Sequence, residues 1–317
     1  MRVGLDVGGT KTDALVVDDA DAVVGTVRLV TGWGPDGVVR TIVDAIDALA
    51  ALPGMDAAAF RTVGVGMPGQ VVPGSSRISH ALNLGVRDLD LVGAVAPLLG
   101  LPVRVENDVK AAAVGAFALE TKAAGGDSRD RPASLAYLNL GTGVAAGVVI
   151  DGRLWRGARG TAGEVGHVSI DARGPKCRCG GHGCIEAFAG GAALTERWGR
   201  PGELPIRDLF DAADAGDPLA RELRTGLASA AAAAVRILVL TTDVDAVVIG
   251  GGLTALRDRL LPDVRAALDE GAAASPFLRS LRLPERVRVL VPGSPAAALG
   301  AAIVGGTTFT EEVLVHG

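Results

Sequence analysis

The sequence predicts an α/β protein with two duplicated lobes around a central cleft, and two observations support this fold class. A pattern of strand, glycine turn, strand and aspartate turn occurs twice, over residues 3–19 and 135–152. Elsewhere, short apolar strands alternate with stretches of helical spacing, as in α/β proteins. The 317 residues suffice for one large domain or two that share a cleft, and 49% hydrophobic residues can build a sizeable core.

The two copies of the hairpin have the same spacing. Gly8 is as far from Asp18 as Gly141 is from Asp151, and each pair encloses a second apolar run. A strand, a tight glycine turn and a returning strand are typical of a β-hairpin. Repetition at matched spacing predicts an internal duplication of a whole domain, although any two antiparallel hairpins look partly alike.

Local patterns predict the other elements. Apolar runs between turn residues indicate strands, and apolar residues three or four apart indicate helices. Outside the hairpins, strands are expected at 23–30, 62–67, 103–105, 153–155 and 245–249, and helices at 37–52, 108–120, 230–242, 295–304 and from Leu253 onward.

The chain is expected to divide into two lobes of unequal size. The smaller lobe comprises residues 1–117, with the C-terminal helix in 295–317 packing back on it, and the larger lobe comprises 118–294. The polar, glycine-containing segment 121–132 is the best candidate for a hinge between them.

Charge and composition exclude several classes of protein. A net charge of -5 argues against the basic face of a nucleic-acid binder. The first residues carry charges where a signal peptide needs an apolar run. The apolar stretch 230–242 contains Arg236 and is shorter than the roughly 20 residues of a membrane span. We therefore expect a cytoplasmic protein with no nucleic-acid and no membrane partner.

Glycine and threonine in both hairpin turns suit phosphate binding. Glycine lets backbone N–H groups converge on an anion, and a threonine hydroxyl adds a donor, so facing turns could clamp a polyphosphate. A third glycine turn follows the strand at 245–249, where it could let adenosine approach the backbone or simply lead into a helix. The nucleotide-binding candidates are Gly8, Gly9, Thr10, Lys11, Gly141, Thr142, Gly143, Gly250, Gly251 and Gly252.

Two aspartates are placed for phosphoryl transfer. Asp108 follows a strand and opens an alanine-rich helix, a position from which a carboxylate can act as general base on a hydroxyl. The alternative is that Asp108 only caps the helix. Asp6 ends the first strand beside the glycine turn, where it can hold Mg²⁺ through water or merely stabilise the turn.

Three cysteines lie within a short, glycine-rich segment. Their odd number and the lack of any sign of export favour a metal site over disulfides. Cys177, Cys179 and Cys184 need one nitrogen ligand to complete a tetrahedral zinc shell. His167 precedes them and His182 lies among them, so either histidine could be that ligand. Three reduced cysteines without a metal are the other possibility.

Four motifs in this order resemble the ROK family of sugar kinases and repressors. Residues 4–11 (GLDVGGTK) are similar to the first phosphate motif of actin-like ATPases and sugar kinases. Residues 106–108 (END) resemble the segment that carries the family's catalytic aspartate. Residues 157–167 and 177–186 look like its signature and zinc segment, so the resemblance runs from residue 4 to about 252.

This resemblance implies the actin-like ATPase (ribonuclease H-like) fold, a homodimer, and transfer of the γ-phosphate of ATP to the 6-hydroxyl of a hexose. It implies Mg²⁺ and a structural Zn²⁺ as cofactors, with Asp108 as the base. It favours His167 over His182 as the fourth zinc ligand, with its other ring nitrogen free to meet the sugar. The sugar-binding residues that it implies are Gly69, Asn83, Asn107, Asp108, Glu164, His167 and Glu186, of which Glu186 could instead be a solvated helix start.

The sugar is expected to be N-acetylglucosamine, with glucose as the alternative. Residues 181–186 look closer to bacterial N-acetylglucosamine kinases, because many glucokinases of the family have an aromatic residue at the position of Ile185. Three positions depart from the family's usual pattern, namely 109–110 (Val-Lys for Ala-Asn), 145–146 (Ala-Ala for two glycines) and Ala116.

Three competing classes are weaker. A sugar-responsive repressor of the family would carry a DNA-reading helix-turn-helix before the first strand, which begins here at residue 2. A sugar-binding pseudoenzyme would not need Asp6, the glycine turn and Asp108 together. A chaperone-like or cytoskeletal ATPase would have no use for the zinc segment.

Overall fold

The computed structural model describes residues 1–125 and 131–307, which fall into two compact units. The first unit comprises Met1–Arg131, Gly152–Ala162 and Pro295–Gly317, and the second comprises Pro132–Asp151 and Gly163–Ser294. The hinge candidate 121–132 and the C-terminal segment both extend outside the described residues. Residues 152–162 belong to the first unit although their neighbours in sequence on both sides belong to the second.

The first unit is built on a mixed sheet. Its strands lie in the order β3-β2-β1-β4-β8, and β5-β6-β7 form a separate antiparallel sheet. In the main sheet, β1 pairs antiparallel with β2 and parallel with β4, which pairs parallel with β8. The elements of this unit are β1 (Arg2–Val7), β2 (Lys11–Val17), β3 (Val23–Val30), α1 (Gly34–Ala50), β4 (Thr62–Met67), β5 (Gln70–Val71), β6 (Arg77–Ala81), β7 (Val86–Asp90), α2 (Leu91–Leu99), β8 (Val103–Asn107), α3 (Asp108–Ala123), β11 (Arg153–Trp155) and α11 (Ala296–Gly306).

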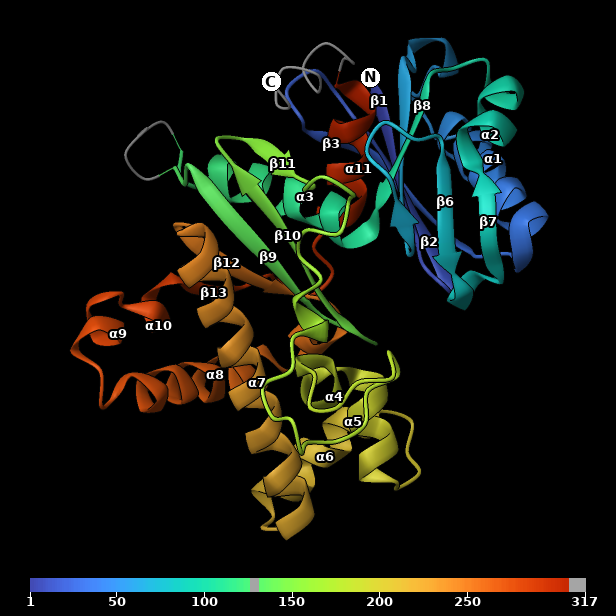
Figure 1. Ribbon diagram of the computed structural model, residues 1–317. Helices are drawn as coiled ribbons and strands as arrows, with labels where there is room; N and C mark the ends of the chain where they lie inside the picture. The colour runs from blue at the N-terminus through green and yellow to red at the C-terminus, as the bar shows by residue number, and fades with distance from the viewer. Residues whose placement is uncertain (126–130, 308–317) are drawn as a thin grey trace. The chain divides into compact units, whose positions relative to one another are not determined.

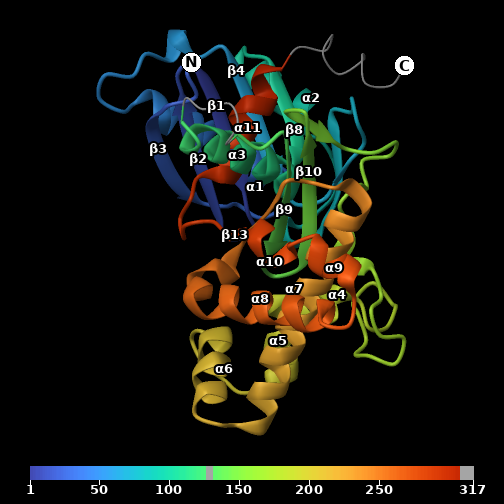
Figure 2. The same cartoon turned by 90° about the vertical axis from the view of Figure 1, so that its left-hand side faces the viewer.

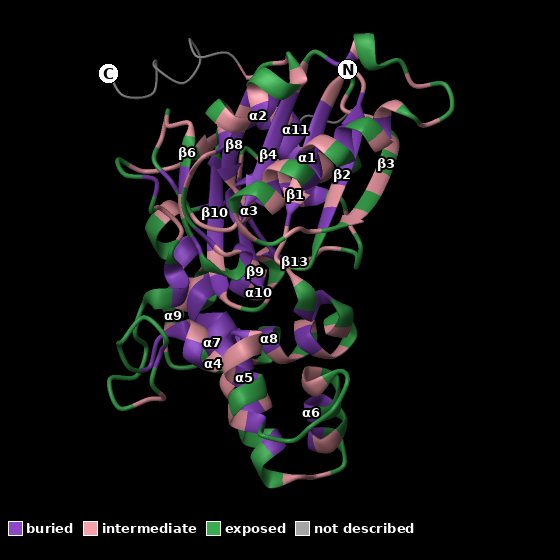
Figure 3. Cartoon of the chain, turned by 90° about the vertical axis from the view of Figure 1, so that its right-hand side faces the viewer, coloured by how far each residue is buried: buried purple, intermediate pink, exposed green. Residues whose placement is uncertain are grey.

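Helices cover both faces of this sheet, with α1 and α2 on one side and α3 and α11 on the other (Figure 1). Helix α1 buries Val38, Ile42 and Leu49, which recur with helical spacing and face the sheet. Burial of such an apolar face is the main favourable term for folding. The buried residues of β1, β4 and β8 complete this core (Figure 3).

Helix α11 packs unusually close to the sheet and to α3, as its small residues predict. A Cβ added to Gly64 in β4 would lie 1.8 Å from the carbonyl oxygen of Ala301, and one on Gly115 in α3 would lie 1.8 Å from that of Ala296. Any larger residue at Gly64 or Gly115 would therefore push α11 away.

The second unit repeats the strand pattern of the first. Its sheet has the strand order β11-β10-β9-β12-β13, in which β9 is antiparallel to β10 and parallel to β12, and β12 is parallel to β13. Matching β9, β10, β12 and β13 with β1, β2, β4 and β8 confirms the predicted duplication. The elements of this unit are β9 (Ser134–Leu140), β10 (Val144–Ile150), α4 (Ile185–Ala189), α5 (Gly191–Trp198), α6 (Pro205–Asp214), α7 (Pro218–Thr242), β12 (Ala246–Gly250), α8 (Arg257–Ala272), α9 (Pro276–Ser280), α10 (Leu283–Arg286) and β13 (Val287–Val289).

Helix α7 is the core helix of the second unit, and α4, α6 and α8 pack against it (Figure 2). It begins at Pro218, well before the expected start at residue 230, because Asp217 caps it by accepting a 3.0 Å hydrogen bond from the N–H of Ala220. Among the described helices it alone is long and apolar enough to cross a membrane. However, 61% of its most apolar window is buried inside the protein, as in a soluble core helix.

Two expected helix starts were inaccurate, and one small sheet was not expected. Helix α1 starts at Gly34 rather than Gly37, with a proline in its first turn. After Gly252 the chain first makes a short 3₁₀ turn to Leu256, and α8 begins only at Arg257. The sheet β5-β6-β7 was not expected, because its strands are short and partly exposed and so lack a clear alternating pattern.

Candidate active site and metal centre

Asn107 and Asp108 lie at the junction of β8 and α3 in the first unit. Asn107 is the N-cap, since its Oδ1 accepts hydrogen bonds from the N–H groups of Val109 and Lys110, both at 3.1 Å. Asp108 is the first helical residue and is half-buried, and its Oδ1 also accepts the N–H of Val109 at 2.9 Å. Because Asn107 caps the helix, Asp108 is not needed as the cap. The first turn also favours its negative charge.

Further contacts fix this junction. The side-chain amide of Asn107 donates to the carbonyl of Gly69 at 3.0 Å, which brings two predicted sugar ligands together. Glu106 is buried, with Oε1 accepting the N–H of Asn107 at 2.9 Å and Oε2 lying 2.6 Å from Nε of Arg156. Sequence reasoning gave no role to Arg156 or to the side chain of Glu106, because their partnership is visible only in three dimensions.

Asp6 lies near Asp108 because β1, β4 and β8 are parallel and end at the same edge of the sheet. It is half-buried and pairs in register with Asp13 of β2. Burial of its carboxyl group, then the charges of Asp108 and Asp13, raise the pKa of Asp6 to about 7, against a smaller opposing effect of Lys11. The charges of Asp108 and Asp13 both act on Asp6, and Asp13 is itself ion-paired with Arg28 and Lys11. Carboxylate oxygens suit a divalent cation, so Asp6 and Asp108 are the candidate ligands for one.

The first phosphate turn packs directly on Asn83. A Cβ on Gly9 would lie 3.1 Å from the carbonyl oxygen of Asn83, so the turn and this predicted sugar ligand are in contact. Thr10 and Lys11 are exposed, and Nζ of Lys11 lies 3.6 Å from Oδ2 of Asp13. Lys11, one of the predicted phosphate ligands, is thus already paired with an acid.

Replacing Asp6 by asparagine should stabilise the substrate-free protein at pH 8 while abolishing its activity. The pKa of Asp6 is about 7 in the folded state, against about 4 when unfolded. Between these values the unfolded chain is ionised and the folded chain protonated, so stability falls as pH rises, and the loss is complete above pH 7. Asparagine is neutral throughout, so its gain should be on the order of 4 kcal/mol at pH 8 and small near pH 4.

Thermal melts of both proteins at pH 4.5 and pH 8 measure this gain. Asp18→Asn is the control, because backbone N–H groups of Ala22 and Ala20 lower the pKa of Asp18, so that its substitution should give no gain at pH 8. A gain for Asp6→Asn that is equal at both pH values would contradict the raised pKa.

The second phosphate turn, between β9 and β10, is tied to the residues around Glu186. Oε2 of Glu186 accepts the N–H of Val144 at 2.9 Å, and a Cβ on Gly143 would lie 2.5 Å from that oxygen. The carbonyls of Gly141 and Thr142 accept N–H groups from the start of α5. Glu186 is therefore a half-buried residue that shapes the turn, and not a solvated helix start.

Gly250, which ends β12, and the two glycines after it have different roles. A Cβ on Gly250 would lie 2.1 Å from the hydroxyl of Tyr137, and one on Gly251, whose φ is +87°, would lie 2.5 Å from the carbonyl oxygen of Leu140. Both are needed for packing within the second unit. Only Gly252 has nothing within 4 Å of an added Cβ, so it is the glycine of the three that offers room to a ligand.

Glu164 caps and His167 ends a short 3₁₀ turn, Val165–His167, that packs on β10. The N–H of Ala146 donates to the carbonyl of Gly163 at 2.7 Å, and a Cβ on Gly166 would lie 1.9 Å from the carbonyl oxygen of Val144. This packing leaves both the Glu164 and the His167 side chains exposed. The structure thus places them on one short segment of the second unit, available to a ligand.

His167 and the three cysteines form one cluster. Their ligand atoms all lie within 4.8 Å of one another, with Nδ1 of His167 4.0 Å from Sγ of Cys177 and Sγ of Cys179 3.7 Å from Sγ of Cys184. Zinc–sulfur bonds of about 2.3 Å give a tetrahedral edge of about 3.8 Å, so the arrangement fits a zinc ion. His182 is outside the cluster, with Nδ1 3.4 Å from the carbonyl of Gly174.

The thiols differ in acidity. Burial raises the pKa of Cys184 to about 12 and also raises that of Cys177, while the N–H of Gly181 and the neighbouring thiols lower the pKa of Cys179 to about 7. Without a cation, three thiolates in this space would repel one another strongly. A bound Zn²⁺ would offset that repulsion, which agrees with a closed structural site.

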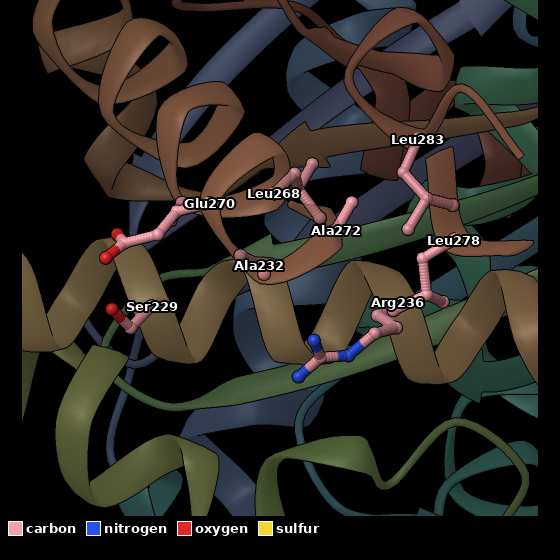
Figure 4. A pocket seen from close by; sticks show the side chains of 10 residues that line it. Ser229, Ala232, Arg236, Leu268, Glu270, Ala272, Leu278 and Leu283 are labelled. Atoms are coloured by element: carbon pink, nitrogen blue, oxygen red, sulfur yellow. The ribbon is translucent and has the colours of Figure 1, made fainter. Parts of the chain in front are cut away.

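A surface pocket of about 270 Å³ lies elsewhere in the second unit, between α7, α8 and α10 (Figure 4). Ser229, Arg236 and Glu270 are among its lining residues, and none of the predicted site residues is. Arg236 lies beside Gly271 near the C-terminal end of α8, where a cation stabilises the helix.

The sequence matches the ROK family over residues 2–305, and the chain belongs to that family. A glucokinase of Streptomyces coelicolor is 33% identical over 284 residues, covering 84% of this chain and 86% of the relative. An N-acetylmannosamine kinase of Yersinia pseudotuberculosis is 30% identical over 255 residues, covering 79% of this chain and 82% of the relative. The chain is thus a ROK family sugar kinase.

A solved structure supports the fold. A ROK family glucokinase from Streptomyces griseus, in complex with glucose and AMPPNP, matches with a TM-score of 0.75 and 29% identity, covering 96% of this chain and 98% of the other. The fold is that of the actin-like ATPases, as the resemblance implied.

Proposed function

We propose that this kinase transfers the γ-phosphoryl group of ATP to the 6-hydroxyl of a hexose. The observation that carries the proposal is the grouping of Asp108, Asp6 and the glycine turn 8–11 at one edge of the first sheet. Phosphoryl transfer needs a base at the hydroxyl, a cation site and phosphate-binding N–H groups, and this edge supplies all three.

Asp108 is proposed to accept the proton of the sugar hydroxyl as its oxygen bonds to phosphorus and ADP departs. Backbone N–H groups of residues 8–11 and 141–143 would bind the phosphates. Asp6 would hold Mg²⁺, which neutralises charge on the phosphates when bound. Gly252 would leave room for adenosine beside β12, with Gly250 and Gly251 shaping the backbone there.

The sugar hydroxyls are proposed to bind the residues that the family resemblance implies. In the first unit these are Gly69, Asn83 and Asn107; the Asn107 amide donates to the Gly69 carbonyl, and Asn83 packs against Gly9. In the second unit they are Glu164, His167 and Glu186, the last through the oxygen that Val144 does not engage. The zinc ion would fix His167 so that its second ring nitrogen meets the sugar.

The identity of the sugar is the most specific part of the proposal. Ile185 has no exposed surface, so it cannot contact a sugar directly, which weakens the expectation of N-acetylglucosamine that depended on it. The similarity to glucokinases favours glucose, whereas the similarity to an N-acetylmannosamine kinase favours an N-acetylhexosamine. We propose that glucose and N-acetylglucosamine are the two leading substrates. A cytoplasmic location is proposed from the composition of the sequence, and a homodimer from the family resemblance.

A panel of sugars tests the proposal. Purified protein with ATP and Mg²⁺ should release ADP only when a hexose with a free 6-hydroxyl is added, and 6-deoxyglucose, which lacks the acceptor oxygen, should give none. Comparison of kcat/KM for glucose, mannose, N-acetylglucosamine and N-acetylmannosamine ranks the substrates. Equal ADP release with glucose and 6-deoxyglucose would contradict transfer to the 6-hydroxyl.

A further inference from the structure

Among residues 1–125 and 131–307, two charged side chains are buried, and they flank the Asn107–Asp108 pair. Glu106 and Lys110 are each 3% exposed. Lysine and glutamate are almost never fully buried unless a partner compensates for the loss of water. Two such residues on either side of the base therefore require a specific reason.

Both buried charges bind the same segment of chain. Oε2 of Glu106 lies 2.6 Å from Nε of Arg156, and Nζ of Lys110 donates to the carbonyl of Gly160 at 2.8 Å. We call residues 152–162 the strap segment. The junction of β8 and α3 thus holds the strap segment at two points, through one ion pair and one charge-assisted hydrogen bond.

Gly160 is also fixed from its other side. Its φ is +75°, and an added Cβ would lie 2.3 Å from the carbonyl oxygen of Val71. Val71 is in β5, which begins directly after Gly69, and Gly69 accepts the amide of Asn107. Lys110, Gly160, the β5 strand and Asn107 therefore form a closed ring of contacts within the first unit.

The strap segment leads directly to the sugar ligands of the second unit. The chain passes from the first unit to the second between Ala162 and Gly163, and Glu164 and His167 follow at once. A group that holds Gly160 in place therefore also restricts the backbone that leads to Glu164 and His167. Lys110 stands where the family commonly has asparagine, so this anchor is a feature of the present chain's own residues.

We propose that Lys110 is a positioning residue, whose buried ammonium group holds the strap segment and thereby sets the geometry of the sugar-binding residues. This inference rests on the proposed kinase function. Lys110 contacts neither substrate and takes no part in proton transfer. Its loss should therefore weaken sugar binding and spare both ATP binding and the chemical step.

Steady-state kinetics of Lys110→Met separates these effects. Methionine fills the same buried space without a donor, so KM for the sugar should rise about tenfold or more, while kcat at saturating sugar and KM for ATP stay within about threefold. Lys110→Arg retains a cationic donor and should restore most of the loss. Lys122→Met is the matched control, because Lys122 is exposed near the end of the same helix.

The outcomes decide between roles. A lower melting temperature with an unchanged sugar KM would show that Lys110 only stabilises the fold. A fall in kcat alone would indicate a direct catalytic role. Either result would overturn the proposal. If Lys110→Met does not fold, Arg156→Gln removes the other anchor and should raise the sugar KM in the same way. A wild-type protein that phosphorylates no sugar refutes the kinase function before any variant is compared.

Discussion

Asp108→Asn should lower kcat by about three orders of magnitude and leave sugar affinity nearly unchanged. A sugar hydroxyl is a poor nucleophile at neutral pH, and a positioned general base contributes roughly 10²–10⁴ in rate. Asparagine keeps the size and most hydrogen bonds of aspartate but cannot accept a proton. Calorimetry of sugar binding and coupled detection of ADP release measure the two quantities separately.

Asp90→Asn is the matched control. Asp90 caps α2 through a 3.0 Å hydrogen bond from the N–H of Gly93, and asparagine caps helices about as well as aspartate. Its substitution should therefore leave kcat unaltered. If Asp108→Asn were equally silent, Asp108 would not be the base.

Among the predicted substitutions, those that remove the candidate metal centre should have the second largest effect on the protein. Cys179→Ser should release the zinc and lower both the free energy of unfolding and the sugar affinity. Zinc-finger sites contribute about 10–16 kcal/mol of binding free energy, so the cost here should be on the order of several kcal/mol. Metal analysis of wild-type protein purified without added zinc should find about one zinc per chain.

Two histidine variants test which histidine is the fourth metal ligand. His167→Ala should lose the zinc, because Nδ1 of His167 lies in the cluster. His182→Ala should keep it, because that ring points to the carbonyl of Gly174 instead. Retention of zinc by the first variant and its loss from the second would reverse the assignment, and a fully active metal-free protein would remove the centre from the account.

The hairpins and the parallel strands were predictable because their signals are local. Val3–Val7 and the glycine turn after it specify β1 and the start of β2 by themselves, and the same reasoning holds for residues 135–150. Helix starts were less accurate, since Pro218 and Asp217 define the start of α7 through capping rather than through apolar spacing. The short strands β5 to β7 depend on pairing with one another, which a periodic pattern cannot show.

The candidate site was predictable as a set of motifs but not as a set of contacts. Asp6 was found because it ends a strand beside a glycine turn, Asp108 because it follows a strand and opens a helix, and Asn107 because residues 106–108 resemble a family motif. Arg156 and Lys110 were not given a role, since they act through residues about 50 positions away, Glu106 and Gly160. Sequence spacing alone left both His167 and His182 open, the family resemblance favoured His167, and the three-dimensional cluster agrees with His167.

Phosphorus NMR of the reaction product tests the central claim most directly. With ATP, Mg²⁺ and the best sugar of the panel, the wild-type protein should convert the γ-phosphate into a phosphate monoester on the sugar's O6, and Asp108→Asn should form it about a thousand times more slowly. Release of inorganic phosphate without any sugar phosphate, or a 6-phosphate formed equally fast by both proteins, would contradict the account.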